Sequence, residues 1–278
     1  MTGSGRGAGR IGVKVLTAVI LPWTLVPLVW MLLSSVRPSG ELTASPPQLA
    51  FSPTLAHHRS LFGGANDIGG YAVNSIVAAG ASTIIAVGLG ALAGYGLARS
   101  RFRGKDHVAF WIISTRMAPI AAVMLPLFVI FRATGLLGTT QRLVVAYLTF
   151  NLPFAIWIMN AFFARLPPGL KEAAMVDGAS PWQAFRKIAL PLVVPGLATT
   201  AILWLVFSWN DYAFAATFSG PDSQTLPMAA SQLVTQTEID WGQLTAIGTN
   251  VVAPMIFIGL IVRRWLVAGL TLGAVTGE

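Results

Sequence analysis

Long uncharged stretches dominate the hydrophobic and polar pattern of this chain. A helix needs about 20 mostly apolar residues to cross about 30 Å of hydrocarbon. Six such stretches occur, and Arg116 interrupts the third. Apolar residues do not alternate at period two, as barrel strands would require. The pattern therefore predicts an all-α membrane protein with one transmembrane domain over residues 1–278, whose six spans lie near 13–34, 72–98, 108–131, 143–164, 188–210 and 244–262.

The composition agrees with a membrane-embedded chain. Hydrophobic residues make up 55% of the sequence and charged residues only 10%, whereas soluble domains carry roughly 25% charged residues. An ordinary soluble globule is therefore excluded. The absence of cysteine excludes disulfide frameworks, thiolate metal sites and cysteine nucleophiles. The three histidines lack the H-x-x-x-H spacing of a metal site, so we assign no metal.

The Lys and Arg residues are distributed unevenly among the connections between spans. If the N-terminus lies in the cytoplasm, the inner segments carry 13 of the 18 basic residues and the outer segments carry four. This bias predicts that both termini are cytoplasmic. The net charge of +8 then needs no nucleic-acid partner, because the lipid bilayer and its inner surface account for it. The first span contains Pro22 and Pro27 and is followed by no A-x-A site, so we expect a retained helix rather than a secretory signal.

The connection between the fourth and fifth spans, residues 166–187, is called the elbow below. Pro167 and Pro168 end the preceding helix, and a proline is tolerated where a new helix begins. Gly178 supplies a helix stop, and Ser180 followed by Pro181 has the composition of an N-cap and first turn. We therefore predict two short cytoplasmic helices joined at Gly178. A compact charged segment of this kind is typical of a docking element.

The elbow carries a long spaced motif. Glu172-Ala173-Ala174, Gly178 and Ile188-x-Leu190-Pro191 fit the pattern EAA-x3-G-x9-I-x-L-P, a signature of permease subunits of bacterial ABC importers. The chain resembles the second permease of the carbohydrate branch, of the maltose or glycerol-phosphate type. Further residues that carry the resemblance are Asp177-Gly178-Ala179, Asn74-Ser75, Trp209-Asn210-Asp211, Ala268-Gly269-Leu270-Thr271 and Gly273-Ala274-Val275.

The resemblance implies that the elbow is a coupling helix seated in a cleft of a cytoplasmic ATPase. Glu172 would make a charged contact, Ala173 and Ala174 would allow close approach, and Gly178, preceded by Asp177, would make the turn. The implied partners are a second permease subunit in a heterodimer, two copies of the ATPase subunit and an extracytoplasmic solute-binding protein. Taken by themselves, Glu172 and Gly178 also fit an ordinary loop helix with a solvated carboxylate and a glycine cap.

ATP binding by this chain itself is not expected. The phosphate-binding loop has the pattern G-x-x-x-x-G-K-[ST]. At the only Gly-Lys pair, Gly104-Lys105, Arg99 replaces the first glycine and Asp106 replaces the Ser or Thr. We therefore expect a non-hydrolysing subunit without a bound cofactor, with ATP and Mg²⁺ used by the partner subunits.

Polar side chains within the spans are candidates for the translocation path or a gate, because buried polar groups in membranes usually face protein or a water-filled path. Arg116 could instead reach the inner surface by snorkelling, and Asn210 and Asp211 could cap a helix. Gly90 and Gly94 allow close helix packing, either within this subunit or against a second permease. The candidate polar residues are Arg116, Asn151, Asn160, Asn210, Asp211 and Asn250.

These features favour a permease subunit that translocates a sugar or related polar solute inward, powered through the elbow. A secondary transporter or channel is the alternative. Such proteins often show internal repeats or intramembrane carboxylates, and neither is evident here. A membrane-embedded enzyme would need a convergent set of catalytic side chains, and the sequence indicates none.

Overall fold

The computed structural model describes residues 5–46, 50–62, 67–136, 138–234 and 239–274, with side chains described between residues 12 and 262. Over these ranges the chain is helical, and the only strand-like pairing is an isolated bridge between Val234 and Ile239. The predicted all-α class is confirmed. Among the described residues, four helices are long and apolar enough to cross a membrane, or up to six if each of two bent helix pairs is one span. The four are α1 (Gly5–Ser35), α4 (Ile68–Arg99), α7 (Thr140–Ala164) and α14 (Trp241–Ala274).

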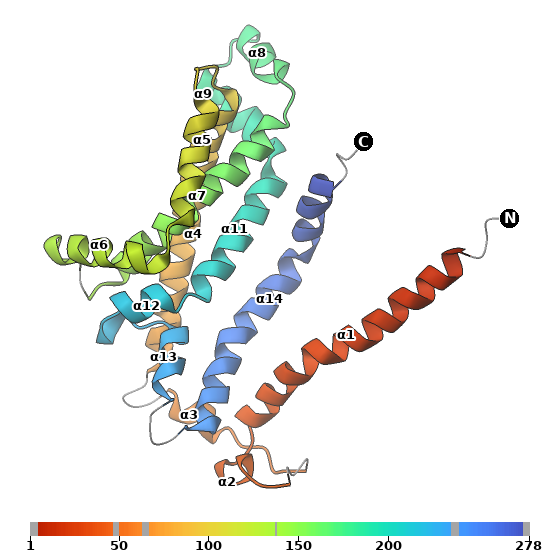
Figure 1. Cartoon of the computed structure of the whole chain (residues 1–278), viewed down its shortest axis with the longest axis vertical. Helices are drawn as coiled ribbons and strands as arrows, with labels where there is room; N and C mark the ends of the chain where they lie inside the picture. Colours follow the sequence, from red (N-terminus) through yellow and green to blue (C-terminus); the bar gives the residue numbers. More distant parts are fainter. Residues whose placement is uncertain (1–4, 47–49, 63–66, 137, 235–238, 275–278) are drawn as a thin grey trace. The chain divides into compact units, whose positions relative to one another are not determined.

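The third predicted span is not a continuous helix. Helix α5 (Lys105–Ser114) runs into a 3₁₀ turn (Thr115–Met117), and α6 (Ile120–Ala133) then departs at 91° (Figure 1). Ala118 is extended, with ψ at 132°, because a residue that precedes proline is driven out of the helical region. The predicted span over 108–131 is therefore bent rather than one continuous helix, and Pro119 is the reason.

The fifth predicted span is also bent at its start. The segment Pro181–Leu192 meets α11 (Val194–Trp209) at 74°. Pro195 lies in the first turn of α11, where its missing N–H costs nothing. Residues 188–193 therefore belong to the segment that leads out of the elbow, and the straight part of the span begins at Val194. The remaining elements are α2 (Ser39–Leu42), α3 (Ala56–Ser60), α8 (Gly169–Val176), α9 (Pro181–Ala184), a π-helical turn (Phe185–Ala189), α10 (Leu190–Leu192), α12 (Ala213–Phe218), a 3₁₀ turn (Pro221–Ser223) and α13 (Leu226–Gln232).

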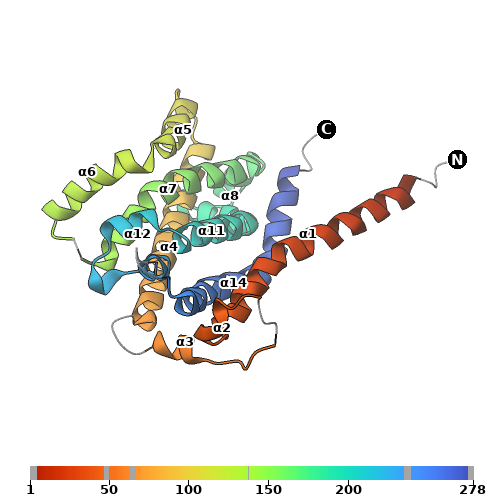
Figure 2. The same ribbon diagram turned by 60° about the horizontal axis from the view of Figure 1, so that its bottom comes forward.

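The chain divides into two compact units, and the larger comprises residues 69–228 and 254–278. In it, α7 packs beside both α4 and α11 (Figures 1 and 2). The α4 contact requires glycine: a Cβ on Gly94 would lie 2.6 Å from the backbone nitrogen of Asn160, and one on Gly90 would lie 2.8 Å from the Cβ of Ala155. These two glycines therefore pack within this subunit.

Aromatic side chains fill the core of the larger unit. One cluster joins α6, α7 and α12 through Phe131, Tyr147, Phe150, Phe214 and Phe218. A second cluster, around Phe163 and Phe185, packs the end of α7 against the π-helical turn at the end of the elbow. The end of the elbow is thus packed against α7.

The smaller unit comprises residues 1–68 and 229–253. Its segment after α1 folds back on itself: the Thr54 N–H donates to the Val36 carbonyl at 2.8 Å, and a ring nitrogen of the buried His57 lies 2.9 Å from the Arg37 carbonyl. Gly242, at the start of α14, leaves the space that the His57 imidazole occupies. This histidine is a packed core residue of its unit.

Candidate functional site

The turn at the centre of the elbow is built from backbone hydrogen bonds. At the end of α8, the Gly178 N–H donates to the Met175 carbonyl at 3.1 Å and the Ala179 N–H donates to the Ala174 carbonyl at 2.9 Å. This is a Schellman motif, which closes a helix through a left-handed residue. Gly178 supplies that residue with φ at +85°, and nothing lies within 4 Å of the position that a Cβ would take. Backbone conformation, rather than lack of room, therefore requires glycine here.

The second elbow helix has a complete cap. Ser180 Oγ accepts from the Gln183 N–H at 3.2 Å, and Gln183 Oε1 accepts from the Ser180 N–H at 2.8 Å. This reciprocal capping box satisfies two backbone donors that the helix start leaves free. Pro181 occupies the first turn, as the sequence predicts. The direction of the chain between α8 and α9 is thus fixed from both sides of the turn.

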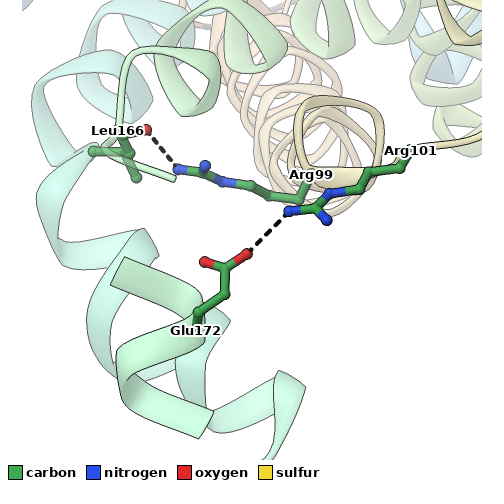
Figure 3. A network of polar contacts seen from close by, with 4 residues as sticks. All are labelled: Arg99, Arg101, Leu166 and Glu172. Atoms are coloured by element: carbon green, nitrogen blue, oxygen red, sulfur yellow. Dashed lines mark hydrogen bonds and ion pairs between the residues drawn. The ribbon is translucent and has the colours of Figure 1, made fainter. Parts of the chain in front are cut away.

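Two arginines hold the elbow: Arg99, the last residue of α4, and Arg101, in the connection that follows it (Figure 3). Arg101 Nη2 lies 3.4 Å from Glu172 Oε1, and Arg99 Nη2 donates to the Leu166 carbonyl at 2.9 Å. The Arg101 side chain is 88% exposed and that of Glu172 is 55% exposed. Glu172 is therefore positioned by a neighbour and still open to a partner.

The side chains of α8 divide into an inner and an outer set. Ala174 is buried at 5% exposure, so it packs within this chain, whereas Ala173 and Asp177 are exposed. Three large apolar side chains also face outward on the elbow: Met175 at 46%, Val176 at 87% and Trp182 at 57% exposure. The motif does not include these three. In the sequence, these three residues stand out only because they are apolar and lie in an otherwise charged connection.

A polar cavity of about 130 Å³ lies between helices of the larger unit. It brings together three of the six candidate polar residues, Arg116, Asn151 and Asp211. The other lining residues are Ile120, Tyr147, Phe150, Phe207, Ser208 and Phe214. Tyr147 and Asn151 are four residues apart on α7, a spacing that places two side chains on one helix face. This spacing is the signal by which Tyr147 could have been included from the sequence.

Buried hydrogen bonds fix one wall of the cavity. The Asn151 amide donates to Ser208 Oγ at 2.7 Å, and Ser82 Oγ donates to the same oxygen at 3.3 Å. These contacts join α4, α7 and α11. Each of the three residues is at most 5% exposed, and buried polar groups are costly unless they are paired in this way. Asn151 is accordingly held in one orientation.

Asp211 lies two residues after the end of α11 and caps the next helix, α12. Its Oδ1 accepts from the Phe214 N–H at 3.0 Å and from the Ala215 N–H at 3.3 Å, so the helix-cap interpretation holds for this residue. Burial raises the pKa of Asp211 to about 6, although the two backbone hydrogen bonds oppose the rise. Asp211 also lines the cavity. Asp211 therefore both caps a helix and lines the cavity.

Two further polar groups line the cavity without a polar partner in the described part of the chain. Tyr147 is only 3% exposed, and its hydroxyl makes no hydrogen bond there. The Arg116 guanidinium carbon lies 5.1 Å from the centre of the Phe150 ring, a cation–π contact. Arg116 thus faces the interior of the unit beside an aromatic ring.

The remaining three candidates do not line this cavity. The Asn210 and Asn250 amides each donate to a carbonyl four residues earlier, those of Val206 and Ala246, at 2.8 Å. The backbone of Asn160 lies against Gly94 in the α4–α7 contact. These three asparagines have helix or packing contacts in place of a shared site.

Asn74 and Ser75, which the sequence marks only by resemblance, connect α4 to the segment before α13. The Asn74 amide donates to the carbonyls of Asp222 at 3.0 Å and Gln224 at 3.1 Å. Ser75 Oγ accepts from the Leu226 N–H at 2.9 Å. The pair therefore fixes the position of residues 222–226. The tail motifs at 268–275 fall outside the residues whose side chains are described.

Comparison with known proteins places these features among transport proteins. Residues 86–272 match the family described as binding-protein-dependent transport system inner membrane component. The trehalose transport system permease SugB of Mycobacterium tuberculosis is 38% identical over 272 residues, covering 95% of this chain and 96% of the relative. The trehalose/maltose permease MalG of Thermococcus litoralis is 31% identical, covering 95% of each chain.

The fold also matches a solved structure. A chain of a bacterial ABC transporter involved in import of the acidic polysaccharide alginate superposes with a TM-score of 0.77 at 21% identity. The match covers 95% of this chain and 98% of that chain. The bent third and fifth spans therefore occur in a fold already seen in a transporter.

Proposed function

This chain belongs to the family of binding-protein-dependent transport system inner membrane components, and from that membership we propose that it is one permease subunit of an ATP-driven importer for a sugar or related polar solute. It is a multi-pass inner membrane protein. Relatives named for trehalose, maltose and diacetylchitobiose transport support a sugar as the cargo. The proposed direction is inward, with both termini in the cytoplasm, supported by the 13 basic residues on the inner segments.

The proposed partners follow from the same membership. The subunit would pair with a second, different permease and would receive cargo from an extracytoplasmic solute-binding protein. Two copies of an ATPase subunit would bind ATP and Mg²⁺, since this chain lacks the phosphate-binding motif. This chain would contribute the path for the solute and the surface on which the ATPase acts.

The elbow is the proposed point of coupling, and its outer surface carries the proposal. Exposed apolar side chains rarely gather on a charged connection without a partner. Here Met175, Val176 and Trp182 are exposed beside Glu172, and two capped helix ends hold the segment. A cleft in the ATPase would cover the apolar side chains and offer a charge to Glu172. Ala173 is exposed on the same helix, where a small side chain permits close approach.

The mechanism proposed for this arrangement is a rigid transfer of motion. Closure of the ATPases on ATP would move α8, and the aromatic contacts of Phe185 with Phe163 would pass that movement to α7. The helices would then rock, turning the solute path from an inward to an outward opening. The bends before α6 and α11 are breaks in helical hydrogen bonding at which such rocking could occur.

Gly178→Val tests the coupling. The left-handed conformation at this residue is unfavourable for a branched side chain, so the turn should distort while the spans remain folded. We expect loss of solute uptake into cells that carry the variant in place of the wild-type chain, and ATP hydrolysis by the purified complex that no longer responds to transport. Gly169→Ala is the matched control, because Gly169 has open space and no left-handed backbone. Unchanged uptake by Gly178→Val would refute the coupling role.

A secondary transporter or channel is the second candidate function. The two candidates differ in whether an ATPase copurifies with the tagged chain and whether uptake stops when ATP is depleted at constant membrane potential. A panel of labelled mono-, di- and oligosaccharides and a glycerol phosphodiester, tested for uptake into the same cells, would identify the cargo class.

A further inference from the structure

The cavity formed by Arg116, Tyr147, Asn151 and Asp211 has no role in the coupling described above. Its volume of about 130 Å³ is well below the roughly 300–1,000 Å³ of pockets that enclose a whole small ligand. It therefore suits a part of a solute. Phe207 and Ile120 line it and are 51% and 40% exposed.

The two charged side chains of the cavity have opposite hydrogen-bonding roles. Arg116 can only donate hydrogen bonds, and the Asp211 carboxylate can only accept them. Both line the cavity, and no ion pair joins them in the described part of the chain. A simple anion would be repelled by Asp211, and a simple cation by Arg116. A hydroxyl group both donates and accepts, so neighbouring hydroxyls of one molecule match both residues.

Tyr147 provides a second, independent observation. Its side chain is 97% buried and lines the cavity, yet its hydroxyl has no partner among the described residues. A buried polar group without a partner is unfavourable, so the Tyr147 hydroxyl lacks a hydrogen bond that a bound molecule would supply. The hydroxyl can serve as donor or acceptor to that molecule.

Aromatic rings supply the rest of the lining. Phe150, Phe207 and Phe214 present apolar surface around the polar groups. A pyranose ring has apolar C–H faces and hydroxyls at its rim, which is the same combination. Asn151 is already bonded to Ser208, so that wall is preformed rather than assembled on binding.

We propose that this cavity is a subsite of this subunit for one pyranose ring of the transported sugar, with Arg116, Tyr147 and Asp211 contacting its hydroxyls. The proposal rests on the sugar-import function proposed above and adds that this chain itself selects among sugars. Selection would then occur in the membrane as well as in the binding protein. An uncharged ring with adjacent hydroxyls is the chemical class that the site would take.

The test compares Tyr147→Phe with Tyr212→Phe in cells that carry each variant in place of the wild-type chain. Tyr212 is 48% exposed and does not line the cavity, so its variant is the matched control. The probes are radiolabelled trehalose, maltose and diacetylchitobiose. We expect Tyr147→Phe to lower uptake of the sugar that wild type carries by about tenfold, the effect of one lost hydrogen bond. Tyr212→Phe should stay within twofold of wild type.

A second variant and a second measurement separate binding from folding and from coupling. Arg116→Gln should also lower uptake and change the order of preference among the three sugars. In both cavity variants, the amount of chain in the membrane and the amount of ATPase subunit that copurifies with it should equal those of wild type. Unchanged uptake and unchanged preference in both cavity variants would overturn the subsite while leaving the importer function intact. Failure of wild type to take up any of the three sugars would overturn the subsite together with the sugar assignment.

Discussion

Arg101 Nη2 lies 3.4 Å from Glu172 Oε1, so the connection after α4 holds the first residue of the EAA motif (Figure 3). Both side chains are largely exposed, and exposed ion pairs contribute only about 0–1 kcal/mol to stability. The contact therefore orients Glu172 more than it stabilises the fold. We expect this contact to hold the Glu172 carboxylate in a position where an ATPase subunit would bind it.

Substitutions at Arg101 and Glu172 test whether the ion pair only orients Glu172 or whether Glu172 itself binds the ATPase. We expect Arg101→Ala to reduce ATPase copurification about twofold, because Glu172 remains present but less ordered. Glu172→Ala should reduce it tenfold or more, because the contact itself is lost. The double variant Arg101→Glu with Glu172→Arg restores the internal pair and should still fail to bind the ATPase. Full recovery in the double variant would show that the pair is needed only within this chain.

Gly94 is expected to be intolerant of larger residues. A Cβ at this position would meet the Asn160 backbone nitrogen at 2.6 Å, and backbone cannot move aside as a flexible side chain can. We expect Gly94→Val to lower stability by about 1–3 kcal/mol, as overpacking does, seen as a lower Tm of the detergent-purified complex. Gly88→Val on the same helix is the matched control, since nothing lies within 4 Å of its Cβ. Equal Tm losses for the two variants would contradict the close α4–α7 packing.

The sequence predicts the helical class because span length and charge distribution depend on local composition alone. It predicts less well where a single proline decides the chain direction. Arg116 draws attention as the polar interruption of the third span, yet the 91° bend comes two residues later, where Pro119 forces Ala118 into an extended conformation. The preference of the residue before proline is readable from sequence. Whether the helix resumes in line or at an angle depends on packing.

The site residues are likewise predictable where neighbours in sequence decide the geometry, and not where distant residues meet. The turn at Gly178 and the cap at Ser180 involve neighbours in sequence, so their geometry follows from local rules. The cavity joins residues almost 100 positions apart, from Arg116 to Asp211. A list of polar span residues could include both, but it could not separate them from Asn250, whose amide bonds only its own helix.

Asn74 should prove to be a structural anchor for residues 222–226. Its amide donates to two carbonyls, those of Asp222 and Gln224, and Asn74→Asp would remove both donors at nearly constant shape. Each lost donor leaves a carbonyl without its partner, so we expect backbone amides in 222–226 to exchange with deuterium at least tenfold faster. Asn210→Asp is the control, since that amide bonds only the Val206 carbonyl of its own helix. Unaltered exchange in the Asn74 variant would argue against the anchor.

The raised pKa of Asp211 predicts a specific pH dependence of stability. Burial raises this pKa to about 6 in the folded chain, from a value near 3.8 when unfolded. Between these values the folded state binds more protons than the unfolded state, so Asp211 contributes stability that is lost as pH rises toward and through 6. Asp211→Asn removes the titration while keeping an oxygen that can accept from the Phe214 N–H. The Tm of Asp211→Asn minus that of wild type, measured on the purified complex, should therefore increase as the pH rises from 5 toward 6 and level off between 6 and 7. A difference that stays constant over this range would show that the Asp211 carboxyl is not held in a proton-retaining environment.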